Sequence, residues 1–157
     1  MRAAGGSFLL VSQNVDDLHE RAGADVLSMH GQLLDLACET CRAVVRDREH
    51  VDAHEFVACP SCGAPRLRPD VVWFGEVPRG LDAIERALVD CTDFVAIGTS
   101  GVVWPAAGML HAAREFGART FVQALEAENL VRGDRFVQGR AADVVPGLLD
   151  ELLAPPN

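Results

Sequence analysis

The sequence lacks any apolar run of the roughly eighteen residues that a membrane span requires, so a transmembrane protein is not expected. The amino-terminal apolar segment, residues 8–11, is far too short for the core of a signal peptide, which favours a cytoplasmic protein. Basic residues are also few: there are 14 Lys and Arg against 23 Asp and Glu, for a net charge of −9. This negative net charge argues against binding of nucleic acid by general electrostatic attraction, and it suits basic partners such as lysine-bearing peptides.

What is present is the composition of a globular domain with strands and helices in alternation. The 157 residues are 49% hydrophobic and show no repeat or low-complexity segment. Apolar patterns predict strands over residues 7–12, 71–74, 93–97 and 120–125, and helices over residues 15–23, 81–91, 106–117 and 141–153. Pro146 is expected to interrupt or kink the last helix. The alternation predicts one parallel sheet that contains both residues 8–11 and residues 94–97.

Four of the five cysteines follow the spacing C-x2-C-x17-C-x2-C, which is typical of a structural zinc site. Each pair can close a tight turn that directs two thiolates at one ion, so we expect one Zn²⁺ per chain. The ligands are Cys38, Cys41, Cys59 and Cys62. A disulfide framework is the alternative, and it fits poorly because nothing in the sequence indicates secretion.

Two turns follow predicted strands, where an open parallel sheet binds its ligands. The first carries Gln13, Asn14 and Asp16, and the second contains Gly98, Thr99 and Ser100. The amide and carboxylate groups of the first turn can face a ligand rich in hydroxyl and amide groups. Helix capping by Asn14 or Asp16 is the alternative. The second turn offers hydroxyls and backbone amides at a helix start.

The order of the motifs is more specific than any one of them. It runs "QNVDDLHERAG", "MHG", the four cysteines, "RPDVVWFGE" and "GTSGVVWPAA". Together these resemble the sirtuins, the NAD-dependent protein-lysine deacylases, over nearly the whole chain, and Trp73 is most similar to bacterial and class III members. The resemblance implies an α/β fold: a parallel Rossmann-like sheet, truncated at its amino-terminal part, over residues 1–36 and 67–157, with an inserted zinc-binding module over residues 37–66.

The resemblance also implies residue roles. His30 would be the catalytic base, in a cleft between the nucleotide-binding sheet and the zinc module. The cofactor set would be Gln13 at the nicotinamide ribose, Asn14 and Asp16 at the nicotinamide pocket, and Gly98, Thr99 and Ser100 at the adenosine half of NAD. The set bordering an acyl-lysine tunnel would be Val72, Phe74, Gly75 and Glu76. The acyl group would pass from lysine to ADP-ribose with release of nicotinamide, and the peptide would add as a strand beside "FGE" and "GVV".

Two departures from the family pattern leave two functions open. Sirtuins begin with a strand and a Gly-Ala-Gly-x-Ser phosphate loop, which has no counterpart in these residues, and Ala124 stands where the family has an asparagine that reaches the adenosine ribose. We therefore expect weak NAD binding by this chain alone, unless another chain supplies the amino-terminal segment. One function is an NAD-dependent deacetylase or desuccinylase. The other is a catalytically silent zinc-bearing module that binds a peptide or a partner.

Overall fold

The structure is a computed structural model that describes residues 7–46, 58–99, 106–127 and 130–154. The chain divides into two compact units, residues 9–81 and residues 82–157 together with the first eight residues. Within the described ranges, no helix combines the length and the apolar character needed to cross a bilayer.

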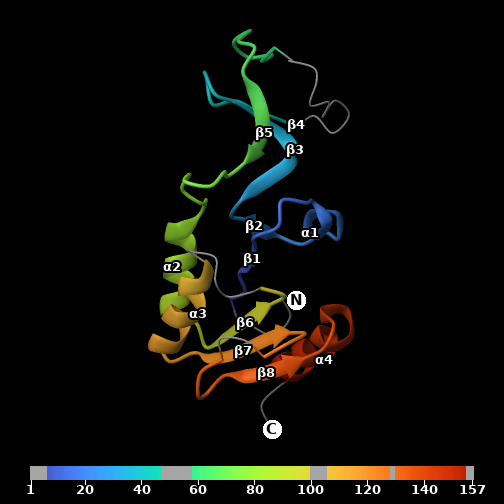
Figure 1. Cartoon of the computed structure of the whole chain (residues 1–157), viewed down its shortest axis with the longest axis vertical. Helices are drawn as coiled ribbons and strands as arrows, with labels where there is room; N and C mark the ends of the chain where they lie inside the picture. Colours follow the sequence, from blue (N-terminus) through green and yellow to red (C-terminus); the bar gives the residue numbers. More distant parts are fainter. Residues whose placement is uncertain (1–6, 47–57, 100–105, 128–129, 155–157) are drawn as a thin grey trace. The chain divides into compact units, whose positions relative to one another are not determined.

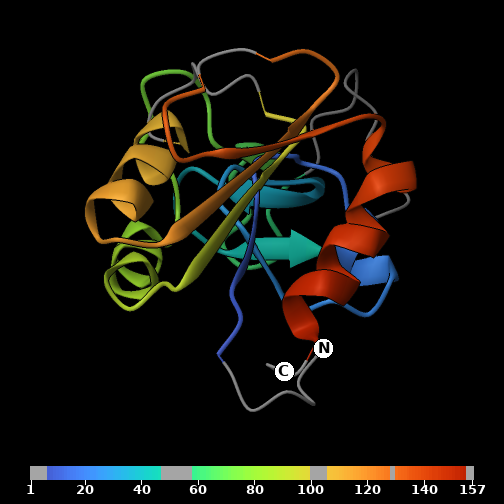
Figure 2. The same cartoon turned by 90° about the horizontal axis from the view of Figure 1, so that it is seen from below.

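The unit of residues 82–157 is a parallel sheet with helices on both faces. Its strands lie in the order β6-β7-β8, and every neighbouring pair is parallel. The strands are β6 (Asp93–Ile97), β7 (Arg119–Ala124) and β8 (Arg135–Gln138), and the helices are α2 (Leu81–Val89), α3 (Ala106–Glu115) and α4 (Ala141–Leu153). Figure 2 shows α2 and α3 on one face of this sheet and α4 on the other. This is the α/β arrangement that the sequence predicts.

An apolar core explains why these segments take these forms. β7 is buried through Phe121 and Val122, and α4 packs against this strand with Leu148 buried. In α2, Ile84 and Leu88 are one helical turn apart and both are buried, as expected for an amphipathic helix. The three predicted helices of this unit are confirmed. α4 continues through Pro146, so of the two predicted effects the interruption is wrong and the kink stays a prediction.

The unit of residues 9–81 contains two smaller sheets (Figure 1). A parallel pair, β1 (Leu10–Ser12) and β2 (Val26–Ser28), is connected through the short helix α1 (Leu18–Arg21). An antiparallel sheet of order β4-β3-β5 follows it. Its strands are β3 (Gly31–Cys38), β4 (Val44–Arg46) and β5 (Leu67–Val71). This second sheet carries the cysteine pairs near its ends and extends beyond the 37–66 module, whose boundaries stay a prediction.

Two expectations about strands are corrected. Residues 8–11 and 94–97 do not share a sheet in the described part of the chain, since β1 pairs with β2 and β6 pairs with β7. The strand expected over "VVWF" ends at Val71, because the amide of Trp73 donates to the carboxylate of Glu76 instead of to a neighbouring strand.

Candidate functional site

The four paired cysteines converge on one point. Their Sγ atoms all lie within 4.8 Å of one another, although the two pairs are separated by 17 residues in the sequence. The same turn forms at both pairs. The amide of Cys38 donates to Ala43 O and the amide of Cys59 to Ala64 O, each over 2.9 Å. Two equivalent knuckles thus present two thiols each.

This donor set fits a zinc ion. Zn–S bonds of about 2.3 Å give a tetrahedron with S···S edges of about 3.8 Å. The Cys38–Cys62 and Cys41–Cys59 sulfur distances are both 3.7 Å, and all four cysteines are free. The disulfide alternative is therefore wrong. With four ligands in place, the ion would be structural, because no position is left open for a substrate.

The thiols differ in how readily they ionise. Hydrogen bonds from the amides of Cys41 and Thr40 outweigh burial and lower the pKa of Cys38 to about 6. The amide of Ala64 would lower the pKa of Cys62, but burial and the three neighbouring thiols raise it to about 12. The protein alone thus favours ionisation of some thiols at the expense of others. A dication supplies the charge that lets all four act as thiolates.

The second cluster lies where β1 and β2 end. Because these strands are parallel neighbours, Gln13 and His30 follow them at the same edge. The Nδ1 atom of His30 lies 2.9 Å from the backbone oxygen of Gln13. A carbonyl oxygen only accepts, so Nδ1 carries a proton, and in the neutral imidazole Nε2 then has the lone pair. His30 is thereby held in the tautomer that a general base requires.

The backbone of His30 is held as firmly as its ring. The amide of Val72 donates to His30 O over 2.8 Å, and the preceding residue, Met29, is fully buried. Gly31 has a φ of +78°, and a Cβ atom there would lie 2.0 Å from the backbone oxygen of Asp70. The "HG" pair is therefore a steric requirement: β5 passes so close behind the histidine that only glycine fits.

The other polar side chains of the first turn have mixed roles. The Oδ1 atom of Asp16 accepts a hydrogen bond from the amide of Leu18 over 3.1 Å, but the N-cap of α1 is Asp17 and has no side-chain cap bond, so the capping alternative is not confirmed. The amide of Asn14 donates to Ser12 Oγ over 3.1 Å, and the Asn14 side chain is exposed. The structure thus brings Gln13 and His30 into contact and leaves Asn14 and Asp16 at the surface of the same turn.

The unit of residues 82–157 contains a pocket of about 550 Å³ at the carboxyl ends of its three strands. Gly98 and Thr99 line it, and Ser100 lies outside the described residues. The opposite wall is formed by Gly139, Arg140 and Ala141, where α4 begins. The first-turn amides of a helix attract negative charge. Sequence reasoning missed this wall, although a glycine between strand and helix, as at Gly98, was the available signal.

Ala124 also lines this pocket, at the end of β7. The family pattern places an asparagine there, so the pocket has an apolar methyl group where an amide is expected. The neighbouring amide, that of Gln123, is buried and donates from Nε2 to Gly139 O over 2.6 Å. Gln123 thus joins the end of β7 to the loop before α4 and keeps the pocket walls together.

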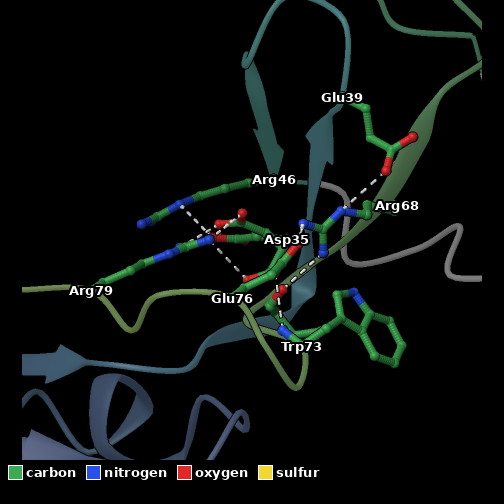
Figure 3. Close-up of polar contacts among 9 residues, drawn as sticks. Asp35, Glu39, Arg46, Arg68, Trp73, Glu76 and Arg79 are labelled. Atoms are coloured by element: carbon green, nitrogen blue, oxygen red, sulfur yellow. Dashed lines mark hydrogen bonds and ion pairs between the residues drawn. The ribbon is translucent and has the colours of Figure 1, made fainter.

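The predicted substrate set forms a tight turn after β5 (Figure 3). Gly75, at the third position of the turn, has a φ of +91°, which a type II turn requires and glycine permits. Phe74 is fully exposed, and Val72 is half-buried beside His30. The carboxylate of Glu76 is engaged within the protein, by the amide of Trp73 and by Arg68.

Comparison with known proteins agrees with these features. The model of the Sir2 family matches residues 1–105. An NAD-dependent protein deacylase of Shewanella oneidensis is 46% identical over 153 residues, which are 95% of this chain and 62% of the relative. The chain therefore spans less than two thirds of the length of this relative.

Solved structures with this fold include complexes. The crystal structure of a Sir2 homolog–NAD complex superposes with a TM-score of 0.81 at 32% identity, over 96% of this chain and 58% of the other. The structure of Sir2Af2 bound to a myristoylated histone peptide gives a TM-score of 0.74 at 31% identity, over 92% and 64% of the two chains.

Proposed function

Because the chain belongs to the Sir2 family, we propose that it is the catalytic part of an NAD-dependent protein-lysine deacylase, which transfers an acyl group from lysine to ADP-ribose and releases nicotinamide. The observation that carries this proposal is the contact between His30 and Gln13, which leaves Nε2 as a base. The relatives compared are named as deacylases, which disfavours the alternative of a silent binding module.

We assign a different part of the reaction to each of the two units. In residues 9–81, His30 removes a proton from a ribose hydroxyl, Gln13 binds the nicotinamide ribose, and Asn14 and Asp16 border the nicotinamide. In residues 82–157, the adenosine half binds at the pocket of Gly98 and Thr99, with Ser100 beside them in the sequence. When bound, NAD would supply the ribose carbon from which nicotinamide leaves and the ribose hydroxyl that finally carries the acyl group. Proton removal of this kind typically contributes about 10²–10⁴ in rate.

The substrates are acyl-lysine peptides or proteins. Val72, Phe74, Gly75 and Glu76 border the acyl chain, Val72 by its half-buried place beside His30 and the others through the turn. A Sir2 protein with this fold has been solved with a myristoylated histone peptide, which supports this substrate class. The segment "GVV" at residues 101–103, the expected second edge for the peptide, lies outside the described residues.

We also propose one structural zinc on the four cysteines, a cytoplasmic location and a requirement for the family's amino-terminal phosphate loop. Four free thiols within 4.8 Å of one another suit a reducing compartment. The phosphate loop would come from a preceding segment or a second chain. Among the described residues, the pocket at Gly98 includes the start of α4 as a site for the charge of NAD.

The test is release of nicotinamide from NAD in the presence of an acetyl-lysine or succinyl-lysine peptide. It should be run with the 157-residue chain alone and with the amino-terminal segment of a relative fused or added in trans. We expect turnover at or near background for the chain alone and robust, peptide-dependent turnover after addition. Binding of peptide without any nicotinamide release in both arms would favour the silent module.

A further inference from the structure

The turn of residues 73–76 presents apolar side chains to solvent and yet is closely held. Trp73, Phe74 and Val77 are all exposed large hydrophobic residues. The turn is closed by two reciprocal hydrogen bonds: the amide of Glu76 donates to Trp73 O over 2.9 Å, and the amide of Trp73 donates to Glu76 Oε2 over 3.0 Å. The Glu76 side chain therefore accepts the backbone hydrogen bond that a neighbouring strand accepts elsewhere in the sheet.

The second carboxylate oxygen of Glu76 is occupied by Arg68 of β5. Arg68 Nη2 lies 2.7 Å from Glu76 Oε1, and Arg68 Nη1 donates to Val71 O over 2.9 Å. The third nitrogen, Nε, lies 3.6 Å from the carboxylate of Glu39. Figure 3 shows the guanidinium between Glu39 and Glu76. One side chain thus contacts the first cysteine knuckle, the end of β5 and the turn.

These contacts need the planar fork of a guanidinium. A lysine ammonium carries all its donors on one nitrogen, so it cannot take the three separate positions that Nε, Nη1 and Nη2 of Arg68 occupy. The Arg68 side chain is 29% exposed, so its pairs are partly shielded from water. The hydrogen bond from the Trp73 amide, and then Arg68, hold the pKa of Glu76 below its usual range, which favours the charged carboxylate.

We propose that Arg68 is a positioning residue that clamps the apolar turn of residues 73–76 to the cysteine-bearing sheet, and that it does so through the carboxylate of Glu76. The inference rests on the proposed function, in which this turn borders the acyl-lysine peptide. Its consequence is that the zinc module contributes to substrate binding through Glu39 and Arg68, although the metal itself takes no part in the chemistry.

The first test is hydrogen exchange of the Trp73 amide, measured by NMR on the whole chain. Arg68→Ala should raise its exchange rate about tenfold or more, since the bond to Glu76 loses its support. The Val72 amide, which donates to His30 O, should keep its rate, which shows that the sheet is intact. Arg46→Ala is the matched control: Arg46 pairs with Asp35 on the same sheet, with 3.7 Å between Nε and the carboxylate. It should leave both rates unchanged.

Arg68→Lys should give an intermediate rate for Trp73, because it restores the charge without the fork. If Arg68→Ala does not fold, Glu76→Gln decides: it keeps an acceptor for the Trp73 amide but removes the charge that Arg68 holds, so exchange should rise severalfold. If the Trp73 amide of Arg68→Ala exchanges at the wild-type rate, the clamp is overturned. If Arg68→Ala does not fold, a wild-type rate in folded Glu76→Gln overturns it.

The second test is the affinity of an acetyl-lysine peptide for the same variants. We expect about fivefold or weaker binding for Arg68→Ala and no change for Arg46→Ala. Faster Trp73 exchange with unchanged peptide affinity would overturn the link from clamp to substrate. A wild-type chain that does not bind the peptide would count against the proposed function, whereas the exchange result would still decide the clamp.

Discussion

The unit of residues 82–157 buries an ordinary apolar core, whereas the unit of residues 9–81 is organised around four thiols. In the former, Phe121, Val122 and Leu148 pack between a parallel sheet and its helices. In the latter, the largest fully buried side chains are Met29, Cys38 and Cys59, and two of these three are metal ligands by our assignment. Stability therefore comes from different sources in the two units.

The chemical roles are divided in the same way. The metal-dependent unit holds single side chains in fixed directions, as the His30 ring is held by Gln13 O. The unit with the apolar core offers a pocket whose wall includes the start of a helix. A general base must be held in a fixed orientation, and a nucleotide must bind to an extended surface. The structure of each unit therefore suits the role that we assign to it.

The largest expected effect is that of metal removal. Binding of structural zinc contributes about 10 kcal/mol of apparent free energy to small metal-dependent modules. Chelation, or Cys38→Ala, should therefore unfold residues 9–81 and leave the unit of residues 82–157 folded. Residue-resolved hydrogen exchange of the two units before and after chelation checks this. Equal loss of protection in both units would remove the contrast between them.

The opposite perturbation is Asp134→Ala, which targets the unit of residues 82–157. The side chain of Asp134 is 1% exposed and accepts hydrogen bonds from Arg114, Thr120 and the amide of Val131. Its removal leaves a partly buried guanidinium without its partner and should cost about 4 kcal/mol. Denaturant unfolding measures the loss, and the exchange protection of residues 9–81 should not change.

The lowered pKa of Asp134 also predicts that this unit loses stability at acid pH. Burial alone would raise its pKa, but the hydrogen bonds from Arg114, Val131 and Thr120 outweigh burial and lower it. A lowered pKa in the folded state stabilises the protein above the unfolded value of about 4, and this stability is lost as the pH falls through the lower folded value. Asp134→Ala should make stability less dependent on pH below about 4, as urea titrations at several pH values would show.

Gly31→Ala should cost about 3 kcal/mol, because the new Cβ atom meets the Asp70 carbonyl and the positive φ is unfavourable for alanine. Gly23→Ala is the matched control, since its φ of +77° is nearly the same and no atom lies within 4 Å of the added Cβ. It should cost about 1 kcal/mol. Equal costs in thermal unfolding would show that β5 does not press against the "HG" pair.

The smallest effect compares the two knuckles. Arg42 and Gly63 occupy the same position in them, and both have positive φ values, 64° and 74°. Arg42→Gly should stabilise the metal-bound protein by about 1 kcal/mol, and Gly63→Ala should destabilise it by a similar amount. Changes of the same sign in chelator titrations would contradict the equivalence of the knuckles.

Elements that carry their own pattern were predictable. The helical spacing of Ile84 and Leu88, and the paired cysteines, led directly to α2 and to the thiol cluster. The strands β2 and β8 were missed because three or four residues show no period, and the end of β5 was misplaced because the bond from Trp73 to Glu76 has no local signature.

For the candidate site, the family resemblance assigned both Gln13 and His30 to the ribose, but the sequence did not predict β2, whose end lies beside that of β1. The structure adds that the main-chain oxygen of Gln13 contacts Nδ1 of His30 and so selects the tautomer of the neutral ring. The wall at Gly139 and Arg140 was missed, although a glycine between a strand and a helix marks it as one marks Gly98. The clamp at Arg68 could not be anticipated, since it joins residues brought together by an irregular pairing of β3 with β5.

The central claim, that Nε2 of His30 is the base, is tested most directly by His30→Ala in the protein completed with the amino-terminal segment. Deacylated peptide would be quantified by mass spectrometry, and NAD binding by calorimetry. We predict a loss of about 10²–10⁴ in turnover with NAD affinity largely retained, because a base acts on the chemical step more than on binding. Full activity of His30→Ala, with NAD still bound, would show that another group removes the proton.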